Sequence, residues 1–384
     1  MIKAIVNGRI LLPEAEVLGK ALLFDERIIG IVDEASARAQ AEEIIDAQGM
    51  YVAPGLVDTH IHGYQGADTS DGNPDDVTRM AKGLLENGVT SFLPTTLTVS
   101  WDLLVKICDQ LRTIRDESQK PEFDGAEVLG MHMEGPFINP AKKGAQNENY
   151  ILPMEPEKVL PVADIIKVIT CSPEMPGGEN FVRVLKQKTN IQISVGHTAA
   201  NYDQAQAAFN LGATRTTHTF NTMPPLAHRD PGVIGAALGR DDVYCELIPD
   251  TFHVNKGLFP MMVKVKGNKL VLITDALRSA GLPDGEYENG GQIFVLKGIE
   301  CRLLDGTIAG SVLRLNHGVR NLRDHASLPM YQAVRAASLN AAESAAVADR
   351  KGSLTPGKDA DIILMDNDCE VYKTIVRGVC KFSK

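Results

Sequence analysis

The 384-residue sequence is poor in cysteine, and the cysteines it has are not grouped. Six cysteines lie far apart along the chain, with no C-x-x-C motif among them. That spacing argues against a disulfide scaffold and against a thiolate zinc site, and it suits reduced thiols in a cytosol. The cysteines are Cys108, Cys171, Cys245, Cys301, Cys369 and Cys380.

Long apolar runs, a secretion signal and an excess of basic charge are also missing. No stretch approaches the length of a membrane span, and the N-terminal apolar run lacks the layout of a signal peptide. The formal net charge of −10 argues against nucleic acid or an anionic membrane as a partner, although it permits a small anionic substrate. With 44% hydrophobic and 23% charged residues, the composition is that of an ordinary globular protein. We therefore expect a soluble, cytoplasmic protein.

From residue 51 onward, short β-rich runs alternate with segments long enough for helices. Such an alternation predicts a parallel sheet, and eight units predict a closed (β/α)8 TIM barrel of the α/β class. The eight runs are "YVAPGLVDTHIH", "TSFLPTT", "VLGMHMEGP", "IIKVITCSPE", "IQISVGHT", "TRTTHTF", "YCELIPD" and "LVLITDA".

The two ends of the chain have a different pattern. Residues 1–50 contain short strands broken by turns, and Asn7-Gly8 is a hairpin signal between two apolar stretches. Strand-like pieces return after residue 290 in "GQIFVL" and "CRLLDGTIAG", followed by a helical stretch and further strands. We predict that 1–50 is the N-terminal part of a small β-sandwich and that 51–290 is the barrel. Residues 291–384 are then the last barrel helix and the C-terminal part of the sandwich.

The motif "VDTHIHG" places two histidines, His60 and His62, at the end of an apolar run. In a strand, residues i and i+2 point to the same face, so both imidazoles point at one spot. Two converging neutral imidazoles are a common start of a metal site. On its own, such a pair is more often an ordinary surface or core polar feature.

Four more ionisable side chains fall at the ends of predicted barrel strands. Glu134 ends the third run, His197 the fifth, His218 the sixth and Asp275 the eighth. The carboxyl ends of the strands form the face on which such barrels hold their active sites. One such residue would be explained as a buried polar group with a hydrogen-bond partner. Together with His60 and His62 they indicate a metal site for hydrolysis.

Imidazole and carboxylate ligands without thiolates fit a catalytic zinc, iron or manganese ion with a position open for water. A bound ion lowers the pKa of water from 15.7 to about 7 and polarises carbonyl oxygens. Asp275 then suits the general base and acid, although a further metal ligand or a structural cap is the alternative. His132 alternates with Glu134 one layer deeper, so we predict that it supports a ligand instead of binding the ion.

Motifs along essentially the whole chain resemble the amidohydrolase superfamily and, within it, the family of N-acetylglucosamine-6-phosphate deacetylases. "GSLTPGKDADI" is typical of the superfamily, whereas "HMEGPF", "FNTMPPLAHRDPG" and "TDALRSAGLPDG" are more specific to that family. The resemblance implies metal-dependent hydrolysis of N-acetyl-D-glucosamine 6-phosphate to D-glucosamine 6-phosphate and acetate, in amino-sugar catabolism or cell-wall recycling. It also implies a homodimer in which phosphate contacts can cross the interface.

By position, the resemblance makes Glu134, His197 and His218 the principal metal ligands. His60 and His62 match members that can hold a second ion, so one or two ions are expected, with zinc first and iron, manganese or cobalt as alternatives. The remaining matches are Asp275 for catalysis, Arg229 and His253 for phosphate, and Ala145, Gln146, Asn221, Thr222, Ile308, Ala309 and Gly310 for the sugar.

Several alternatives stay open. Gln146 stands where many family members have a histidine that helps to orient or polarise the substrate amide, and glutamine can donate a hydrogen bond but cannot carry a proton. Arg229 in "HRDPG" could instead form a surface ion pair with Asp230. The substrate could be the galactosamine epimer or another amide. The chain could also be a silent sugar-phosphate-binding relative, although such proteins usually lose a ligand or the aspartate.

Overall fold

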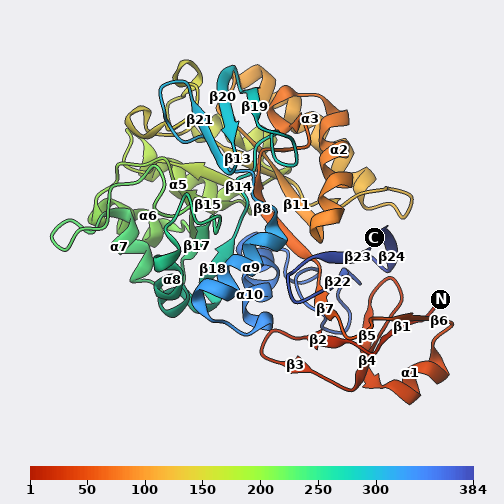
Figure 1. Ribbon diagram of the computed structural model, residues 1–384. Coiled ribbons are helices and arrows are strands. Elements are labelled where there is room, and N and C mark those ends of the chain that lie inside the picture. The colour runs from red at the N-terminus through yellow and green to blue at the C-terminus, as the bar shows by residue number, and fades with distance from the viewer.

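The computed structural model describes residues 1–384 and contains a barrel of parallel strands beside a smaller β-sandwich (Figure 1). All eight predicted runs contain a barrel strand, which confirms the predicted fold class. The ring closes between its first and last strands, where the amide of Asp275, just beyond the last strand, donates to the carbonyl of His60 in the first strand at 2.8 Å. The strands of this sheet are β8 (Leu56–Ile61), β11 (Val89–Thr96), β12 (Glu127–Val128), β13 (Met131–Glu134), β14 (Ile166–Cys171), β15 (Gln192–Val195), β16 (Arg215–Thr216), β17 (Tyr244–Leu247) and β18 (Leu270–Leu272).

Helices cover the outside of the barrel (Figure 1). The helix α6 (Tyr202–Leu211) shows how the sequence sets their ends. Its start is fixed by a capping box between Asn201 and Gln204, and it stops at Gly212 in the left-handed conformation. None of the helices is long and apolar enough to cross a membrane. The other helices around the barrel are α2 (Pro74–Leu84), α3 (Trp101–Ser118), α4 (Pro156–Val159), α5 (Gly178–Lys188), α7 (Gly232–Leu238), α8 (Phe259–Lys266), α9 (Leu315–Ala326), α10 (Met330–Ala337) and α11 (Leu339–Ser344).

The β-sandwich is built from both ends of the chain, as the sequence predicts. One sheet has the order β5-β4-β1-β6 and the other the order β24-β23-β22-β7-β2-β3. A buried cluster that includes Phe24, Val52 and Ile362 lies between them. Its elements are β1 (Lys3–Val6), β2 (Arg9–Leu11), β3 (Glu16–Val17), β4 (Lys20–Phe24), β5 (Ile28–Asp33), α1 (Glu34–Gln40), β6 (Glu43–Asp46), β7 (Tyr51–Pro54), β22 (Ile362–Met365), β23 (Val371–Val376) and β24 (Val379–Ser383).

Two details of the strand pairing differ from the sequence prediction. Asn7-Gly8 does not close a hairpin, because β1 pairs with β4 and β6 whereas β2 pairs with β3 and β7. Asn7, with φ of 54°, instead turns the chain from one sheet to the other. The first predicted barrel run is also divided, since β7 belongs to the sandwich. The division falls at Gly55, where an added Cβ would lie 2.1 Å from Thr90 Oγ1, so the barrel begins at Leu56 and not at residue 51.

A third difference concerns the segment around residue 291. The strands β19 (Gly285–Asn289), β20 (Gln292–Lys297) and β21 (Glu300–Leu303) form their own antiparallel sheet and do not join the sandwich. In Figure 1 this sheet lies at the top of the barrel, far from the sandwich at the lower right. A short hairpin of β9 (Gly63–Tyr64) and β10 (Ala67–Asp68) follows the first barrel strand.

Candidate active site

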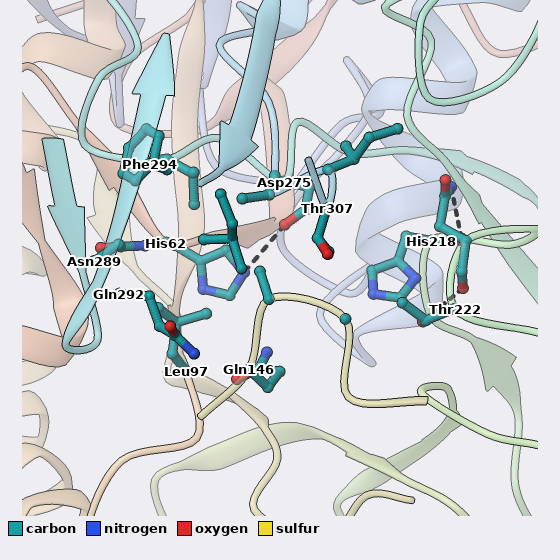
Figure 2. A pocket seen from close by; sticks show the side chains of 18 of the residues that line it. His62, Leu97, Gln146, His218, Thr222, Asp275, Asn289, Gln292, Phe294 and Thr307 are labelled. Carbon is teal, nitrogen blue, oxygen red and sulfur yellow. Dashed lines mark hydrogen bonds and ion pairs between the residues drawn. The ribbon is translucent and has the colours of Figure 1, made fainter. Parts of the chain in front are cut away.

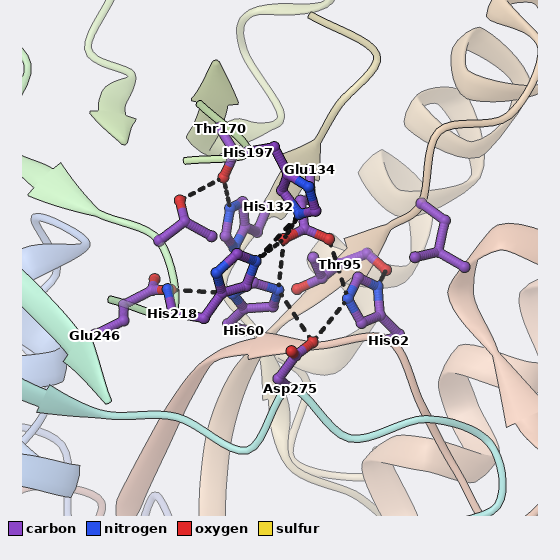
Figure 3. Close-up of polar contacts among 12 residues, drawn as sticks. His60, His62, Thr95, His132, Glu134, Thr170, His197, His218, Glu246 and Asp275 are labelled. Atoms are coloured by element: carbon purple, nitrogen blue, oxygen red, sulfur yellow. Dashed lines mark hydrogen bonds and ion pairs between the residues drawn. The ribbon is translucent and has the colours of Figure 1, made fainter. Parts of the chain in front are cut away.

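Side chains from the ends of the barrel strands converge on one carboxylate (Figure 3). Glu134 is the last residue of β13, and four imidazole Nε2 atoms lie 3.0 to 3.3 Å from its two oxygens. These belong to His60, His62, His197 and His218, all of them buried. The structure therefore brings together every residue that the sequence proposes as a metal ligand.

Three of the converging residues have a left-handed backbone. His197 has φ of 48°, His218 of 31° and Asp275 of 51°. They lie just beyond the ends of β15, β16 and β18, where the chain leaves the barrel wall. Left-handed conformations are unfavourable for residues other than glycine, and they concentrate at functional sites where the surrounding structure imposes them. The surrounding structure thus holds the backbone at this rim in left-handed conformations that the residues themselves do not favour.

The second ring nitrogen of two histidines is held by a backbone carbonyl. His62 Nδ1 lies 3.2 Å from the Thr95 carbonyl, and His197 Nδ1 lies 2.9 Å from the Lys142 carbonyl. Because a carbonyl oxygen can only accept, Nδ1 carries the proton and donates it. In the neutral ring the lone pair is then on Nε2, which faces Glu134. Such outer contacts fix the tautomer and the ring orientation of metal ligands.

Glu246, in the middle of β17, is an orienting residue that the sequence analysis missed. Its Oε2 accepts from His60 Nδ1 and from the His218 amide, each at 3.0 Å, and Oε1 contacts the Arg215 guanidinium. Burial raises the pKa of Glu246, but Arg215 and His60 outweigh it and hold the pKa below its usual range. The sequence signal that could have identified Glu246 is an acidic residue inside the predicted barrel strand "YCELIPD".

The charges of the cluster are strongly coupled. Burial alone would raise the pKa values of Glu134 and Asp275 and lower those of His60 and His62. The opposite charges outweigh burial, so the pKa of both carboxyls is lowered, that of His60 is raised well above its usual value and that of His62 rises to about 9. The site is therefore prepared to hold positive charge next to two ionised carboxylates.

The donor set fits a divalent metal ion. His60, His62 and Glu134 form one group of convergent ligand atoms, and Glu134, His197 and His218 form a second. Glu134 belongs to both, so its carboxylate could bridge two ions. His60 Nε2 is buried and makes no hydrogen bond, as expected of an atom whose natural partner is a cation. Imidazole and carboxylate donors without thiolates suit zinc, iron, manganese or cobalt.

His132 lies beneath the cluster and supports it. Its Nδ1 contacts the Thr59 carbonyl at 3.0 Å and its Nε2 contacts Thr170 Oγ1 at 2.8 Å. Its ring packs edge-on against His60, with the centroids 4.5 Å apart. Since both ring nitrogens already have partners, His132 has no free lone pair for an ion in this arrangement. Burial also holds its pKa well below the usual value, so the ring is neutral.

A pocket opens above the cluster, and its wall contains all the residues predicted to line the sugar (Figure 2). His62, His218 and Asp275 lie at its floor. His253 is also in the wall, with Nδ1 2.6 Å from Asp250 Oδ2. The predicted sugar contacts in the wall are Ala145, Gln146, Asn221, Thr222, Ile308, Ala309 and Gly310.

Gln146 contacts the candidate metal ligand Glu134. Its Nε2 donates to Glu134 Oε2 at 2.7 Å, while its Oε1 accepts from the Thr98 amide at 2.6 Å. The second contact fixes which end of the carboxamide donates. A glutamine at this position therefore orients Glu134 and offers a donor at the pocket floor, without any ability to transfer a proton.

Arg229 is the one predicted site residue that the structure brings neither to the cluster around Glu134 nor to the pocket. It is exposed in the loop before α7 and is absent from the pocket wall of its own chain. It also does not form the alternative ion pair with Asp230 within 4.0 Å. The fold of a single chain thus leaves this guanidinium free.

Comparison with known proteins places the chain in a family. Residues 51–380 match the amidohydrolase family. The N-acetylglucosamine-6-phosphate deacetylase of Bacillus subtilis (strain 168) is 38% identical over 363 residues, which cover 93% of this chain and 91% of that protein. The N-acetylgalactosamine-6-phosphate deacetylase of Escherichia coli O157:H7 is 34% identical over 337 residues, covering 85% and 86%.

A solved structure agrees with the sequence relatives. The crystal structure of N-acetylglucosamine-6-phosphate deacetylase from Pasteurella multocida has a TM-score of 0.93 and 30% identity, and all of both chains is covered. The family match includes the whole barrel and the cluster around Glu134. From these matches we conclude that the chain belongs to the amidohydrolase family.

Proposed function

We propose that this protein hydrolyses the N-acetyl group of N-acetyl-D-glucosamine 6-phosphate, giving D-glucosamine 6-phosphate and acetate. The reaction belongs to amino-sugar catabolism or cell-wall recycling. The observation that carries the proposal is the convergence of four imidazoles and Glu134 beside Asp275 at the floor of one pocket. The relatives from Bacillus subtilis and Escherichia coli are both deacetylases of amino-sugar 6-phosphates, which supports the substrate class.

In this proposal Glu134, His197 and His218 hold the principal ion, and His60 and His62 share Glu134 with a second one. Zinc is the expected metal, with iron, manganese or cobalt as alternatives. A bound divalent ion supplies a Lewis acid that polarises the amide carbonyl and makes a water molecule more acidic. Gln146 keeps the shared carboxylate in place through its 2.7 Å hydrogen bond.

Asp275 is the proposed general base and general acid. Burial raises its pKa, but in the metal-free protein the positive charge of His60 and the hydrogen bond to His62 lower it. A bound cation would take over the place of that positive charge and would likewise favour the ionised carboxylate. Its Oδ1 lies 3.0 Å from His62 Nε2 and 3.4 Å from His60 Nε2. From this place it can take a proton from the attacking water and give it to the amine nitrogen. That second transfer is needed because the amine leaves far more readily than its anion.

The phosphate contacts are proposed to come from two chains. His253 lies in the pocket wall, and its Nδ1 is held by Asp250. Arg229 is proposed to reach the pocket of the other subunit in a homodimer. The support is its exposed position outside its own pocket, together with the planar fork of donors by which arginine binds phosphate oxygens.

We also propose a cytoplasmic location without a nucleic-acid or membrane partner. The net charge of −10 supports the absence of polyanionic partners. Five of the six cysteines are buried free thiols, which suits a reducing compartment.

The experiment that tests the function measures acetate release by the purified protein. The substrates are N-acetylglucosamine 6-phosphate, its galactosamine epimer and unphosphorylated N-acetylglucosamine. Release that is fastest from the glucosamine phosphate, stops on chelation and returns with zinc, iron or manganese is the expected result. Faster release from the epimer would indicate that the protein prefers N-acetylgalactosamine 6-phosphate, as the name of its Escherichia coli relative says of that protein. No release from any substrate by metal-containing protein would overturn the proposal.

A further inference from the structure

The tip of the β19–β20 hairpin reaches into the active-site pocket. Asn289 pairs with Gln292 across a two-residue turn made of Gly290 and Gly291, with φ of 56° and 82°. Positive φ at both central residues is the signature of the tight turn that suits twisted hairpins, and glycine adopts it without strain. Residues directly opposite each other in such a pair place their side chains on the same face.

That face is the one that closes the pocket. Along β20, Phe294 is buried whereas Ile293 and Val295 are exposed, so the strand alternates between the pocket side and solvent. Asn289 and Gln292 both belong to the pocket wall. In Figure 2 they lie on the His62 side of the pocket, across from Thr222 and His218.

The hairpin tip packs against the rim of the barrel. A Cβ added to Gly290 would lie 3.1 Å from Leu97 Cδ1, so the turn packs closely against this side chain. Leu97 itself follows β11 and contributes to the same pocket wall. The two carboxamides are therefore held at a defined place relative to the metal ligands.

Asn289 is buried without a partner. Its side chain is 5% exposed, and neither Nδ2 nor Oδ1 makes a hydrogen bond. A buried amide that remains unpaired is costly, and native proteins pair nearly all such groups. An unpaired carboxamide at the wall of a binding pocket is thus available to form hydrogen bonds with a bound ligand.

We propose that Asn289, assisted by Gln292, binds ring hydroxyls of the amino sugar and thereby sets which sugars are accepted. A carboxamide offers a hydrogen-bond donor and an acceptor together. A hydroxyl can accept from the first and donate to the second. A phosphate would accept a hydrogen bond from the amide N–H but leave the amide oxygen unpaired, and an acetyl methyl would pair with neither. The inference rests on the proposed function, in which C2 carries the reacting amide and C6 the phosphate. The hydroxyls on C3 and C4 are then the neighbouring pair available to the hairpin.

The test compares N-acetylglucosamine 6-phosphate with its 3-deoxy and 4-deoxy analogues and its galactosamine epimer. Wild-type protein is expected to lose at least about tenfold in kcat/KM on one or more of the three altered sugars. Asn289→Leu, which keeps much of the shape of the side chain, is expected to lose about tenfold on the parent sugar. On the altered sugar that wild type rejects, the variant should lose no more than about twofold, because the contact is already absent.

The controls separate a substrate contact from a structural effect. Glu286→Ala changes an exposed residue of the same strand and should behave as wild type, while Gln292→Leu should reproduce the Asn289 effect more weakly. Melting temperature and metal content are measured for every variant. If Asn289→Leu lowers kcat/KM by the same factor on all four sugars, or changes none, the inference is wrong. Failure of the proposed function itself would appear earlier, as absence of acetate release from the parent sugar by wild-type protein.

Discussion

At the residue scale, the two oxygens of Glu134 have different neighbours. Oε1 lies near His60, His197 and His218, and Oε2 lies near His62 and accepts from Gln146. Burial raises the pKa of this carboxyl, yet the surrounding imidazoles lower it well below its usual value. One ionised side chain thus connects both groups of candidate ligands, and its removal affects each of them.

We expect Glu134→Ala to lose its metal and its acetate release together. Elemental analysis of the purified variant should find less than about one-tenth of the wild-type content, because a shared ligand is removed from both groups. Glu157→Ala, at an exposed position of α4, is the matched control and should keep both. A folded Glu134→Ala protein with its full metal content would show that Glu134 is not a ligand.

The second residue-scale prediction concerns Asp275. Replacing it with asparagine keeps the size of the side chain but removes its ability to accept a proton. We expect kcat to fall by about 10² to 10⁴ while metal content and substrate binding stay close to wild type. The measurements are steady-state kinetics and direct titration of the sugar phosphate. A variant that turns over normally, or that loses only substrate affinity, would assign proton transfer to another group.

The sequence could predict the ligands at the rim because their positions depend on one local rule. His197, His218 and Asp275 each follow a short β-rich run, and the carboxyl ends of barrel strands meet at one face. Glu246 and Asn289 do not follow such a rule. The role of Glu246 depends on contacts with other strands of the closed barrel, and that of Asn289 on where a hairpin tip is seated.

At the element scale, the loop between β16 and α7 holds Arg229 outside its own pocket. If this loop serves the other subunit of a dimer, Arg229→Ala should raise the KM for the phosphorylated sugar much more than for the unphosphorylated one. The reason is that only the first substrate offers a phosphate to the guanidinium. Equal effects on both sugars in parallel kinetic assays would remove Arg229 from the phosphate site.

Subunit mixing tests whether that contact crosses between chains. Mixed dimers of Arg229→Ala and Asp275→Asn contain one site with an intact aspartate and an intact arginine from the other subunit. At low substrate concentration, an equal co-expressed mixture should recover about a quarter of wild-type activity, since about half of the dimers are mixed and each has one complete site. No recovery in the mixture, with mixed dimers shown to form, would exclude a shared site.

Element positions could be predicted better than element pairings. The eight barrel runs were found from alternation alone, whereas Asn7-Gly8 joins strands of two different sheets and β19–β21 form a sheet of their own. A turn signal such as Asn7-Gly8 is local and predicts only that the chain reverses its direction there. The partner of each strand is decided by residues far away in sequence, such as those of β22, which pair with β7.

At the scale of the whole molecule, metal loading should be coupled to pH. Burial lowers the pKa of His62, but its hydrogen bonds to Asp275 and Glu134 outweigh that effect and raise the pKa to about 9. The pKa of His60 is also raised. His62 is therefore protonated at pH 7 in metal-free protein, and the raised pKa of His60 favours its protonated form as well, whereas binding an ion through Nε2 requires a neutral ring.

We therefore expect metal loading at pH 7 to release protons, with the proton of His62 among them, and metal affinity to rise as pH increases toward about 9. Calorimetry in buffers with different ionisation enthalpies measures the number released. Wild-type protein is compared with His62→Asn, which removes one of the titrating rings. Release that is near zero at pH 7, or equal in the two proteins, would contradict the charge arrangement described for His60 and His62.

We propose that the whole protein is a metal-dependent deacetylase of an amino-sugar phosphate. The most direct measurement titrates chelated, metal-free protein with zinc while recording both bound ions per chain and acetate release from N-acetylglucosamine 6-phosphate. The account predicts no release before the titration and a rise that follows occupancy until one or two ions are bound per chain. Full release from protein shown to hold less than about one-tenth of an ion per chain would contradict it, because no other group in the pocket supplies the missing electrophile.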